Sequence, residues 1–349
     1  MIKKKNILFV VHRYYPYPGG SEYYVQNMAE EMANRGHEVC VLTGQHKCEQ
    51  GKHNEVYVAT DINGTLTKPW DLIVVHGGDV MMQNIVHQNS FIIKSPIAYM
   101  LIKPSDSEIC QHGMKHSDFL TYSTKADIEH LKKYGYLDKA RRIRHGIPSI
   151  PFATQASTVN AALRKSSGYD IDVFNTCTFL SCGGFYPNKQ MKELADIWNN
   201  MQHFDDKAQL IITGYGMPEN KPESNPAKGL FVFDNLEKED INTLMDYSDG
   251  YIMNSSEEGF GLVLLEAGLA ELPWAARNIA AARDFVTIDP GFGTIYDTNA
   301  QLEKWITRIE SGIQHETSPF LEFVHANHSI EQTGNDIEDI LIELETRRW

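Results

Sequence analysis

The sequence has few cysteines and no long apolar run. Five cysteines are scattered over 349 residues and form no CxxC pair, which argues against a disulfide framework and a zinc knuckle. The first apolar run, Ile7 to Val11, is too short for a signal peptide or a membrane span. These absences favour a cytoplasmic protein whose thiols are buried or idle.

Internal repeats and low-complexity tracts are also missing. What the sequence does contain is 42% hydrophobic residues over a length that suggests two domains, each with its own core. Short apolar runs alternate with amphipathic stretches of helical length, which is typical of α/β proteins with a parallel sheet. We therefore predict two Rossmann-like, doubly wound domains, whose strand ends would face a shared cleft.

The pattern also predicts where the domains begin and end. Residues 1–150 form the first Rossmann-like domain, and residues 151–170, rich in proline and small polar residues, form a linker. Residues 171–330 form the second domain. Residues 331–349 have apolar positions at helical spacing, which predicts a C-terminal helix.

Charge is distributed unevenly along the chain. Residues 1–150 hold 18 Lys+Arg against 15 Asp+Glu, whereas the remainder holds 14 against 31. Three short basic clusters lie in the first part, at Lys3 to Lys5, at Lys132-Lys133 and at Arg141-Arg142-Arg144. Such asymmetry indicates different partners for the two parts, or simply a solvated acidic face.

Two loops after predicted strands could bind an anion. Gly19-Gly20 lies between a strand and a helix that Ser21 could cap, and glycine lets the backbone approach a phosphate closely. Lys189 opens a predicted helix near residues 189–201, where a lysine opposes the helix dipole unless an anion is near. A structural turn and an ordinary surface lysine are the alternative interpretations.

The third loop is "NSSEEGFGLVLLEAG", residues 254–268, with Glu258 and Glu266 eight positions apart. Gly259-Phe260-Gly261 predicts a turn, followed by a helix over residues 262–270 whose start could hold a phosphate. Eight helical positions span about 12 Å, comparable with the distance from sugar to ribose in a nucleotide sugar. Glu266 in an apolar run needs a polar partner such as ribose hydroxyls, unless it is simply exposed.

In order and spacing these loops resemble the glycosyltransferase family 4 pattern. The chain has Gly19-Gly20-Ser21-Glu22 after the first strand and "RGHEV" at residues 35–39 before the second. It has Gly214-Tyr215-Gly216, and the E-x7-E block "SSEEGFGLVLLEA" from Ser255 to Ala267. The resemblance implies the GT-B fold, a first domain that receives the acceptor, a second that binds the nucleotide sugar, and a C-terminal helix crossing back to the first domain.

The resemblance also implies roles for individual residues. Glu258 and Lys189 would be catalytic, with Glu258 on the donor sugar, Lys189 on the pyrophosphate and Glu266 on the ribose. Backbone groups of the glycine-rich loops would complete the donor site, namely Gly19, Gly20, Gly214, Phe260, Gly261 and Leu262. Transfer would retain the anomeric configuration and need no metal or cofactor beyond a UDP- or GDP-sugar substrate; Asp170-Ile171-Asp172 is an incidental DxD match.

Two positions depart from that pattern. The family's arginine before the lysine is replaced by Gly183-Gly184, so that Arg13, Lys103 or another residue would have to supply the second cation. A histidine expected after the strand "SPIAYMLI" is also missing. His76, Lys103 and His112 are therefore the candidate acceptor-binding residues.

The function predicted from these patterns is a hexosyl- or pentosyltransferase that acts on a hydroxyl acceptor, without an obligate protein partner. The basic first part suggests an anionic acceptor, either a lipid phosphate at a membrane surface or a hydroxylated base in DNA; a small sugar or a peptide is the alternative. A sugar-nucleotide epimerase of GT-B fold and a noncatalytic nucleotide-sugar-binding protein remain open as alternative functions.

Overall fold

The computed structural model of the chain consists of two compact units. Unit 1 combines Met1–Pro148 with Asn327–Trp349, and unit 2 is Ser149–Ala326. The structure describes residues 3–14, 16–17, 19–44, 51–78, 80–102, 105–149, 163, 168–169, 171–173, 175–201, 208–234, 236–313 and 317–346. Most of the predicted linker, residues 151–170, therefore lies outside the described residues.

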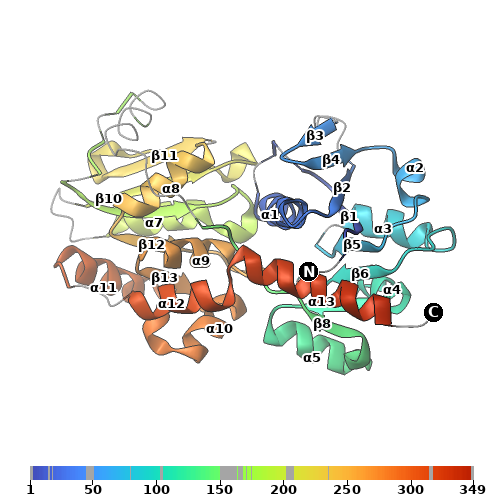
Figure 1. Ribbon diagram of the computed structural model, residues 1–349. Helices are drawn as coiled ribbons and strands as arrows, with labels where there is room; N and C mark the ends of the chain where they lie inside the picture. The colour runs from blue at the N-terminus through green and yellow to red at the C-terminus, as the bar shows by residue number, and fades with distance from the viewer. Residues whose placement is uncertain are drawn as a thin grey trace. The chain divides into compact units, whose positions relative to one another are not determined.

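Unit 1 is built on an eight-stranded sheet in the order β3-β4-β2-β1-β5-β6-β7-β8, in which only the β3–β4 pair is antiparallel (Figure 1). Its strands are β1 Asn6–Val11, β2 Glu38–Thr43, β3 Gly51–His53, β4 Val56–Ala59, β5 Leu72–His76, β6 Ile97–Met100, β7 Phe119–Tyr122 and β8 Ala140–Arg142. Its helices are α1 Gly20–Asn34, α2 Ile62–Leu66, α3 Val80–Gln88, α4 Glu108–His116, α5 Lys125–Tyr134 and α13 Ile330–Thr346.

Unit 2 has a six-stranded parallel sheet in the order β11-β10-β9-β12-β13-β14. Its strands are β9 Cys177–Cys182, β10 Ala208–Gly214, β11 Leu230–Asp234, β12 Gly250–Met253, β13 Trp274–Arg277 and β14 Thr294–Tyr296. Its helices are α7 Met191–Asn200, α8 Lys238–Tyr247, α9 Leu262–Leu269, α10 Ala280–Ile288, α11 Asn299–Glu310 and α12 Ser318–Asn327.

The central strands of both sheets are largely buried. All five residues of β5 and all four of β12 are buried, because helices cover both faces of a parallel sheet. The strand order reverses direction between β1 and β5 in unit 1 and between β9 and β12 in unit 2. This architecture confirms the predicted α/β fold, and it identifies two switch points where doubly wound sheets bind ligands.

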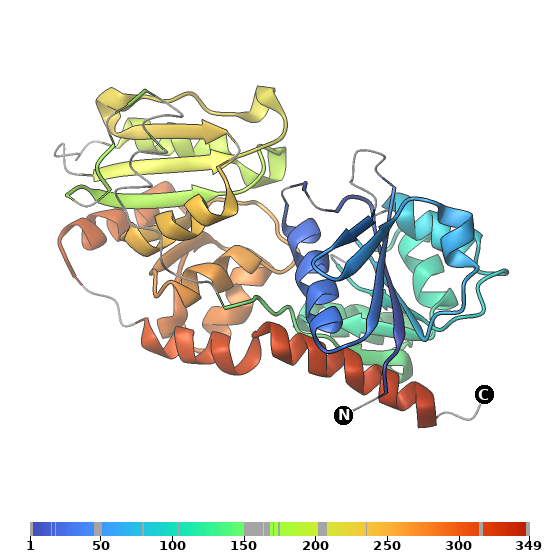
Figure 2. The same cartoon turned by 45° about the horizontal axis from the view of Figure 1, so that its top comes forward.

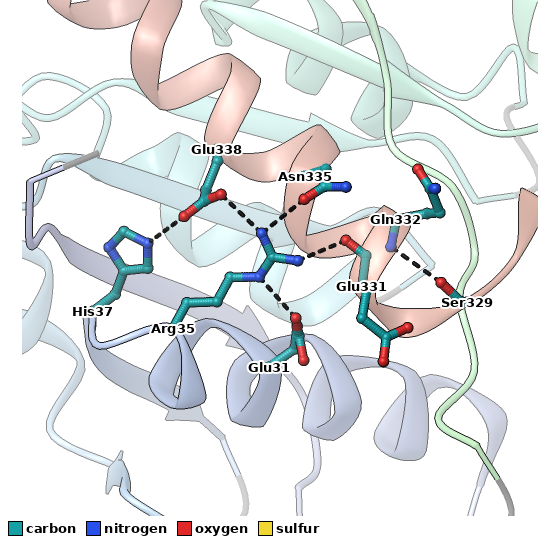
Figure 3. A network of polar contacts seen from close by, with 8 residues as sticks. All are labelled: Glu31, Arg35, His37, Ser329, Glu331, Gln332, Asn335 and Glu338. Carbon is teal, nitrogen blue, oxygen red and sulfur yellow. Dashed lines mark hydrogen bonds and ion pairs between the residues drawn. The ribbon is translucent and has the colours of Figure 1, made fainter. Parts of the chain in front are cut away.

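Helix α13 packs on α1 within unit 1, and Figure 2 shows it crossing one end of that helix. The contact centres on Arg35, in the "RGHEV" segment. Its guanidinium donates to the Glu31 carboxylate at 2.7 Å, to Glu338 at 2.8 Å and to the Glu331 carbonyl at 2.7 Å (Figure 3). A Cβ at Gly334 would lie 2.5 Å from the Arg35 Nε, so a larger residue there would displace the guanidinium.

The basic clusters of unit 1 are largely engaged by acidic residues of the same unit. Lys5 pairs with Glu345 at 2.6 Å, Arg141 with Glu343, and Arg144 with Asp336 at 3.4 Å, all three carboxylates lying on α13. With α13 included, unit 1 holds 20 Lys+Arg against 21 Asp+Glu, and unit 2 holds 12 against 25. The positive charge of residues 1–150 is thus balanced by the chain's own C-terminal helix.

Candidate active site

The candidate site in unit 2 lies at the switch point between β9 and β12. The loop after β9 carries Lys189, and the loop after β12 carries Glu258. The Lys189 ammonium and a Glu258 carboxylate oxygen are 2.5 Å apart, with the two side chains 24% and 13% exposed. The same carboxylate oxygen accepts a hydrogen bond of 2.7 Å from the Ser255 hydroxyl. The structure therefore joins two predicted catalytic residues that are 69 positions apart in sequence.

Lys189 does not open a helix, contrary to the sequence-based prediction. It is the last residue of a 3₁₀ turn, Pro187–Lys189, and α7 begins only at Met191. The residue between them, Gln190, has φ 51° in the left-handed region. The dipole argument used for Lys189 is therefore wrong, and the turn rather than a helix start directs its ammonium towards Glu258.

Glu266 has a cationic partner that the sequence analysis did not identify. The Lys238 ammonium, at the first position of α8, lies 2.5 Å from a carboxylate oxygen of Glu266 on α9. The two side chains are 28% and 18% exposed. The expectation that eight helical positions separate Glu258 from Glu266 is wrong, because the helix begins only at Leu262. The polar partner that Glu266 needs within its apolar run is a lysine of the same unit.

Cys182 lies at the end of β9, close to both ion pairs. Burial raises the pKa of its thiol to about 11; the Glu266 carboxylate adds to this shift, while Lys238 and Lys189 oppose it. Its backbone carbonyl accepts a hydrogen bond of 3.0 Å from the Tyr251 hydroxyl. The two lysine–glutamate pairs therefore lie around the carboxyl end of a single central strand.

The start of α9 adjoins the first of these pairs. Gly261 precedes the helix with φ 83°, a left-handed conformation that glycine adopts without strain, and no side chain caps the first turn. The backbone amides of a helix start favour an anion. Leu262 begins the helix, and the Phe260 ring packs edge-on against Phe285 at 5.7 Å. The structure thus places Phe260, Gly261 and Leu262 as a turn leading into a helix start.

Gly214, a predicted donor-binding residue, has a packing reason for being glycine. It ends β10, and a Cβ there would lie 2.0 Å from the carbonyl oxygen of Gly183. The two loops that follow β9 and β10 could not approach each other with a larger residue. Two backbone hydrogen bonds also join these loops: the Phe185 amide donates to the Tyr215 carbonyl, and the Met217 amide donates to the Phe185 carbonyl.

The glycine loop of unit 1 lies at the other switch point. Gly19 has φ 157° and precedes α1, which begins at Gly20. Ser21 lies within the helix and provides no side-chain cap, so its predicted capping role is wrong. Arg13, a candidate for the family's arginine, pairs with buried Glu22 at 2.8 Å. Burial raises the pKa of the Glu22 carboxyl although Arg13 opposes the shift.

Two of the three candidate acceptor residues lie among the described residues, and their surroundings differ. His76 ends β5 and is 3% exposed, and burial lowers the pKa of its imidazole to about 4. His112 lies on the exposed face of α4, where its ring centroid is 4.2 Å from that of His116. Lys103 lies outside the described residues. The structure does not bring His76 and His112 into contact, and their acceptor role stays a prediction.

Two further features of the described residues bear on metal and membrane chemistry. Within the described ranges, no group of three or more histidine, cysteine or acidic side chains could hold a metal ion. Of the DxD match, Asp170 is outside the described residues, and Asp172 accepts hydrogen bonds from Asn175. Among the same residues, no helix combines the length and apolarity needed to cross a membrane.

Sequence reasoning missed three side chains around the site. Lys238 sits at a helix start, so the dipole argument applied to Lys189 would have found it instead. Asn254 is the first residue after β12, and Arg277 is the last residue of β13. Both are polar residues at the carboxyl end of an apolar strand. Because the carboxyl ends of parallel strands meet at one edge of the sheet, this position could have predicted that they lie near the site.

Comparisons with known proteins agree with this geometry. Residues 176–311 match the model of the family described as glycosyl transferases group 1. HepE of Anabaena, solved with UDP-glucose, has a TM-score of 0.76 at 16% identity, covering 97% of this chain and 100% of that one. Sucrose-phosphate synthase of Thermosynechococcus elongatus has a TM-score of 0.72 at 14% identity, with coverages of 98% and 99%.

A third similar structure is WaaG, a glycosyltransferase involved in lipopolysaccharide biosynthesis, with a TM-score of 0.61 at 16% identity and coverages of 98% and 95%. No curated protein has a significantly similar sequence. The family match lies in unit 2 and includes both ion pairs of the candidate site. Residues 176–311 therefore resemble the glycosyl transferases of group 1, and the two units have the GT-B fold.

Proposed function

We propose that the protein transfers a sugar from a nucleoside diphosphate sugar to a hydroxyl group, with retention of the anomeric configuration. The observation that carries this proposal is the pair of lysine–glutamate contacts at the β9/β12 switch point, on the matched family domain. Each contact combines a cation suited to phosphate with a carboxylate suited to sugar hydroxyls. The structure of HepE in complex with UDP-glucose supports a UDP-sugar as the first substrate to test.

In this proposal, Lys189 and the start of α9 receive the pyrophosphate. The ammonium and the amides of Gly261 and Leu262 would stabilise charge as it develops on the leaving phosphate, usually the dominant contribution in such transfers. Glu258 would accept hydrogen bonds from hydroxyls of the donor sugar. Its contact with Lys189 keeps the carboxylate oriented until the donor is bound.

Glu266 would bind the ribose of the same donor, with Lys238 holding its carboxylate in place. One oxygen of Glu266 is occupied by the ammonium at 2.5 Å. The rest of the carboxylate can accept from ribose hydroxyls, since each oxygen has two lone pairs. Gly19, Gly20 and Gly214 keep the donor-binding roles that the resemblance implies, as part of this proposal.

In this proposal the acceptor carries a hydroxyl group, and its charge has to be determined by a separate measurement. The basic clusters suggested a polyanion, but their ion pairs with α13 account for much of that charge within unit 1. A lipid phosphate or DNA acceptor would show an affinity that falls steeply with salt, in proportion to the phosphates neutralised. Acceptor affinity measured at low and at physiological salt, with donor affinity held fixed, separates a polyanion from a small sugar or a peptide.

The direct test of the proposed function is incubation with a panel of radiolabelled UDP- and GDP-sugars and hydroxyl acceptors. A labelled acceptor with unchanged anomeric configuration is the expected result. A changed sugar without transfer would indicate an epimerase, and binding without turnover a noncatalytic protein. Lys189→Met should abolish most transfer, whereas Lys192→Met, on the exposed surface of α7, is the matched control.

A further inference from the structure

Asn254, the first residue after β12, connects the two loops of the candidate site. The side chain is 1% exposed. Its amide oxygen accepts hydrogen bonds from the Arg277 Nε at 2.8 Å and from the Tyr296 hydroxyl at 2.7 Å. Its amide nitrogen donates to the Gln190 carbonyl at 3.0 Å. The amide therefore links β13 and β14 to the turn that carries Lys189.

The neighbours of Asn254 determine which way its amide points. The Arg277 Nε can only donate, so the atom facing it has to be the amide oxygen. The amide nitrogen then faces Gln190, whose carbonyl can only accept. Arg277 is held in turn by an ion pair with Glu193 on α7. Because the Arg277 Nε can only donate and the Gln190 carbonyl can only accept, these two contacts fix the orientation of the Asn254 side chain.

The turn that carries Lys189 is held on both sides by the loop after β12. On one side, the Gln190 carbonyl accepts from Asn254 and also from the Leu194 amide at 3.0 Å in the first turn of α7. On the other side, the Asn188 carbonyl accepts from the Ser256 amide at 2.8 Å. The backbone before and after Lys189 is thus attached to the same loop that presents Glu258.

We propose that Asn254 is a positioning residue that fixes the Lys189 ammonium relative to Glu258. The inference rests on the proposed function, in which Lys189 receives the donor pyrophosphate. A cation stabilises a transition state best when it is already in place and need not reorganise. The left-handed Gln190 between Lys189 and α7 can keep its conformation because Asn254 binds its carbonyl.

Two variants separate positioning from simple stability. Asn254→Asp keeps an acceptor for Arg277 and Tyr296 but replaces the donor to Gln190 with a carboxylate oxygen, which repels that carbonyl. Asn254→Ala removes the side chain altogether. We expect both to lower kcat about 10- to 100-fold with a smaller change in donor KM, as misplacing a catalytic group by about 1 Å does. Asn278→Ala, which removes an exposed amide contact with Asp297, is the matched control and should leave kcat unchanged.

The decisive measurement combines each Asn254 variant with Lys189→Met. If Asn254 acts through Lys189, its replacement should have almost no further effect on kcat, or on nucleoside diphosphate affinity, in the Lys189→Met background. Equal effects in both backgrounds, or full kcat for Asn254→Asp, would overturn the inference while leaving the proposed function intact. If the wild-type protein neither binds UDP or GDP nor transfers a sugar, the proposed function and this inference are both wrong.

Discussion

The two units are built on the same kind of parallel sheet but use their ion pairs differently. In unit 1, Arg35, Arg141 and Arg144 bind carboxylates of α13, so that these pairs join one element of the fold to another. In unit 2, Lys189 and Lys238 bind Glu258 and Glu266 beside the carboxyl ends of the strands. This difference in position relative to the strand ends is the reason why we propose a stabilising role for the pairs of unit 1 and a ligand-binding role for those of unit 2.

The largest expected effect is a loss of kcat with little change in the melting temperature. Lys189→Met and Glu258→Gln should each reduce kcat about 10²- to 10³-fold, because each removes a preorganised group at the reacting centre. Their melting temperatures should change little, since the pair is partly exposed. In contrast, Glu322→Gln, on the exposed surface of α12, should leave kcat unchanged. Retained turnover in Glu258→Gln, measured with saturating donor, would remove this carboxylate from the mechanism.

The next largest effect concerns stability in unit 1. Arg35→Met should lower the free energy of unfolding by about 2–3 kcal/mol, because it removes several hydrogen bonds to carboxylates and leaves Glu338 without its arginine. The kcat of Arg35→Met, measured below its melting temperature, should remain near that of the wild type. The matched control is Arg308→Met, an exposed arginine on α11. If Arg35→Met and Arg308→Met unfold at the same denaturant concentration, the α13 contact contributes no stability.

A smaller effect distinguishes the two pairs within unit 2. Lys238→Met and Glu266→Ala should each raise the dissociation constant of the nucleoside diphosphate about 10-fold, which corresponds to about 1.4 kcal/mol. Their kcat at saturating donor should fall much less than that of Glu258→Ala, since the ribose is remote from the reacting carbon. Calorimetric titration with UDP or GDP provides the measurement. Equal losses of affinity and kcat in all three variants would contradict separate roles for the two carboxylates.

The smallest expected effect per residue is the loss of folding stability that each buried histidine of unit 1 causes at acidic pH. Burial lowers the pKa values of His145 to about 3 and of His76, His87 and His328 to about 4, all in unit 1. The unfolded chain then binds more protons than the folded one, so stability is complete above pH 6.5 and is lost as the pH falls towards 4. Each histidine should cost unit 1 about 1 kcal/mol between pH 7 and 5.5.

Unit 2 provides the contrast for that experiment. No histidine is buried among its described residues, so acidification to pH 5.5 has no comparable cost for unit 2. Hydrogen exchange measured peptide by peptide at pH 7 and 5.5 should therefore show protection lost mainly in unit 1. Equal loss in the two units would contradict the role of the buried histidines.

Particular residues show how far sequence reasoning reached. The alternation of apolar runs and helical stretches predicted the α/β fold correctly, and the E-x7-E block lies within residues 176–311, which match the model of glycosyl transferases group 1. Local details were less accurate: Lys189 lies in a 3₁₀ turn, Ser21 is not a cap, and two of the three basic clusters bind an acidic helix. Each of these depends on contacts outside the local sequence pattern.

The sequence by itself determined the repeating pattern, the glycine-rich turns and the two carboxylates of residues 255–267, because periodicity and motif spacing are local properties. Only the tertiary structure decided which cation each carboxylate meets. Glu258 meets Lys189 across 69 positions because β9 and β12 are neighbours in the sheet, and Glu266 meets Lys238 across 28. Asn254 reaches Gln190 across 64 positions for the same reason. Strand order brings such residues together, and strand order is set by the packing of the whole unit rather than by any one segment.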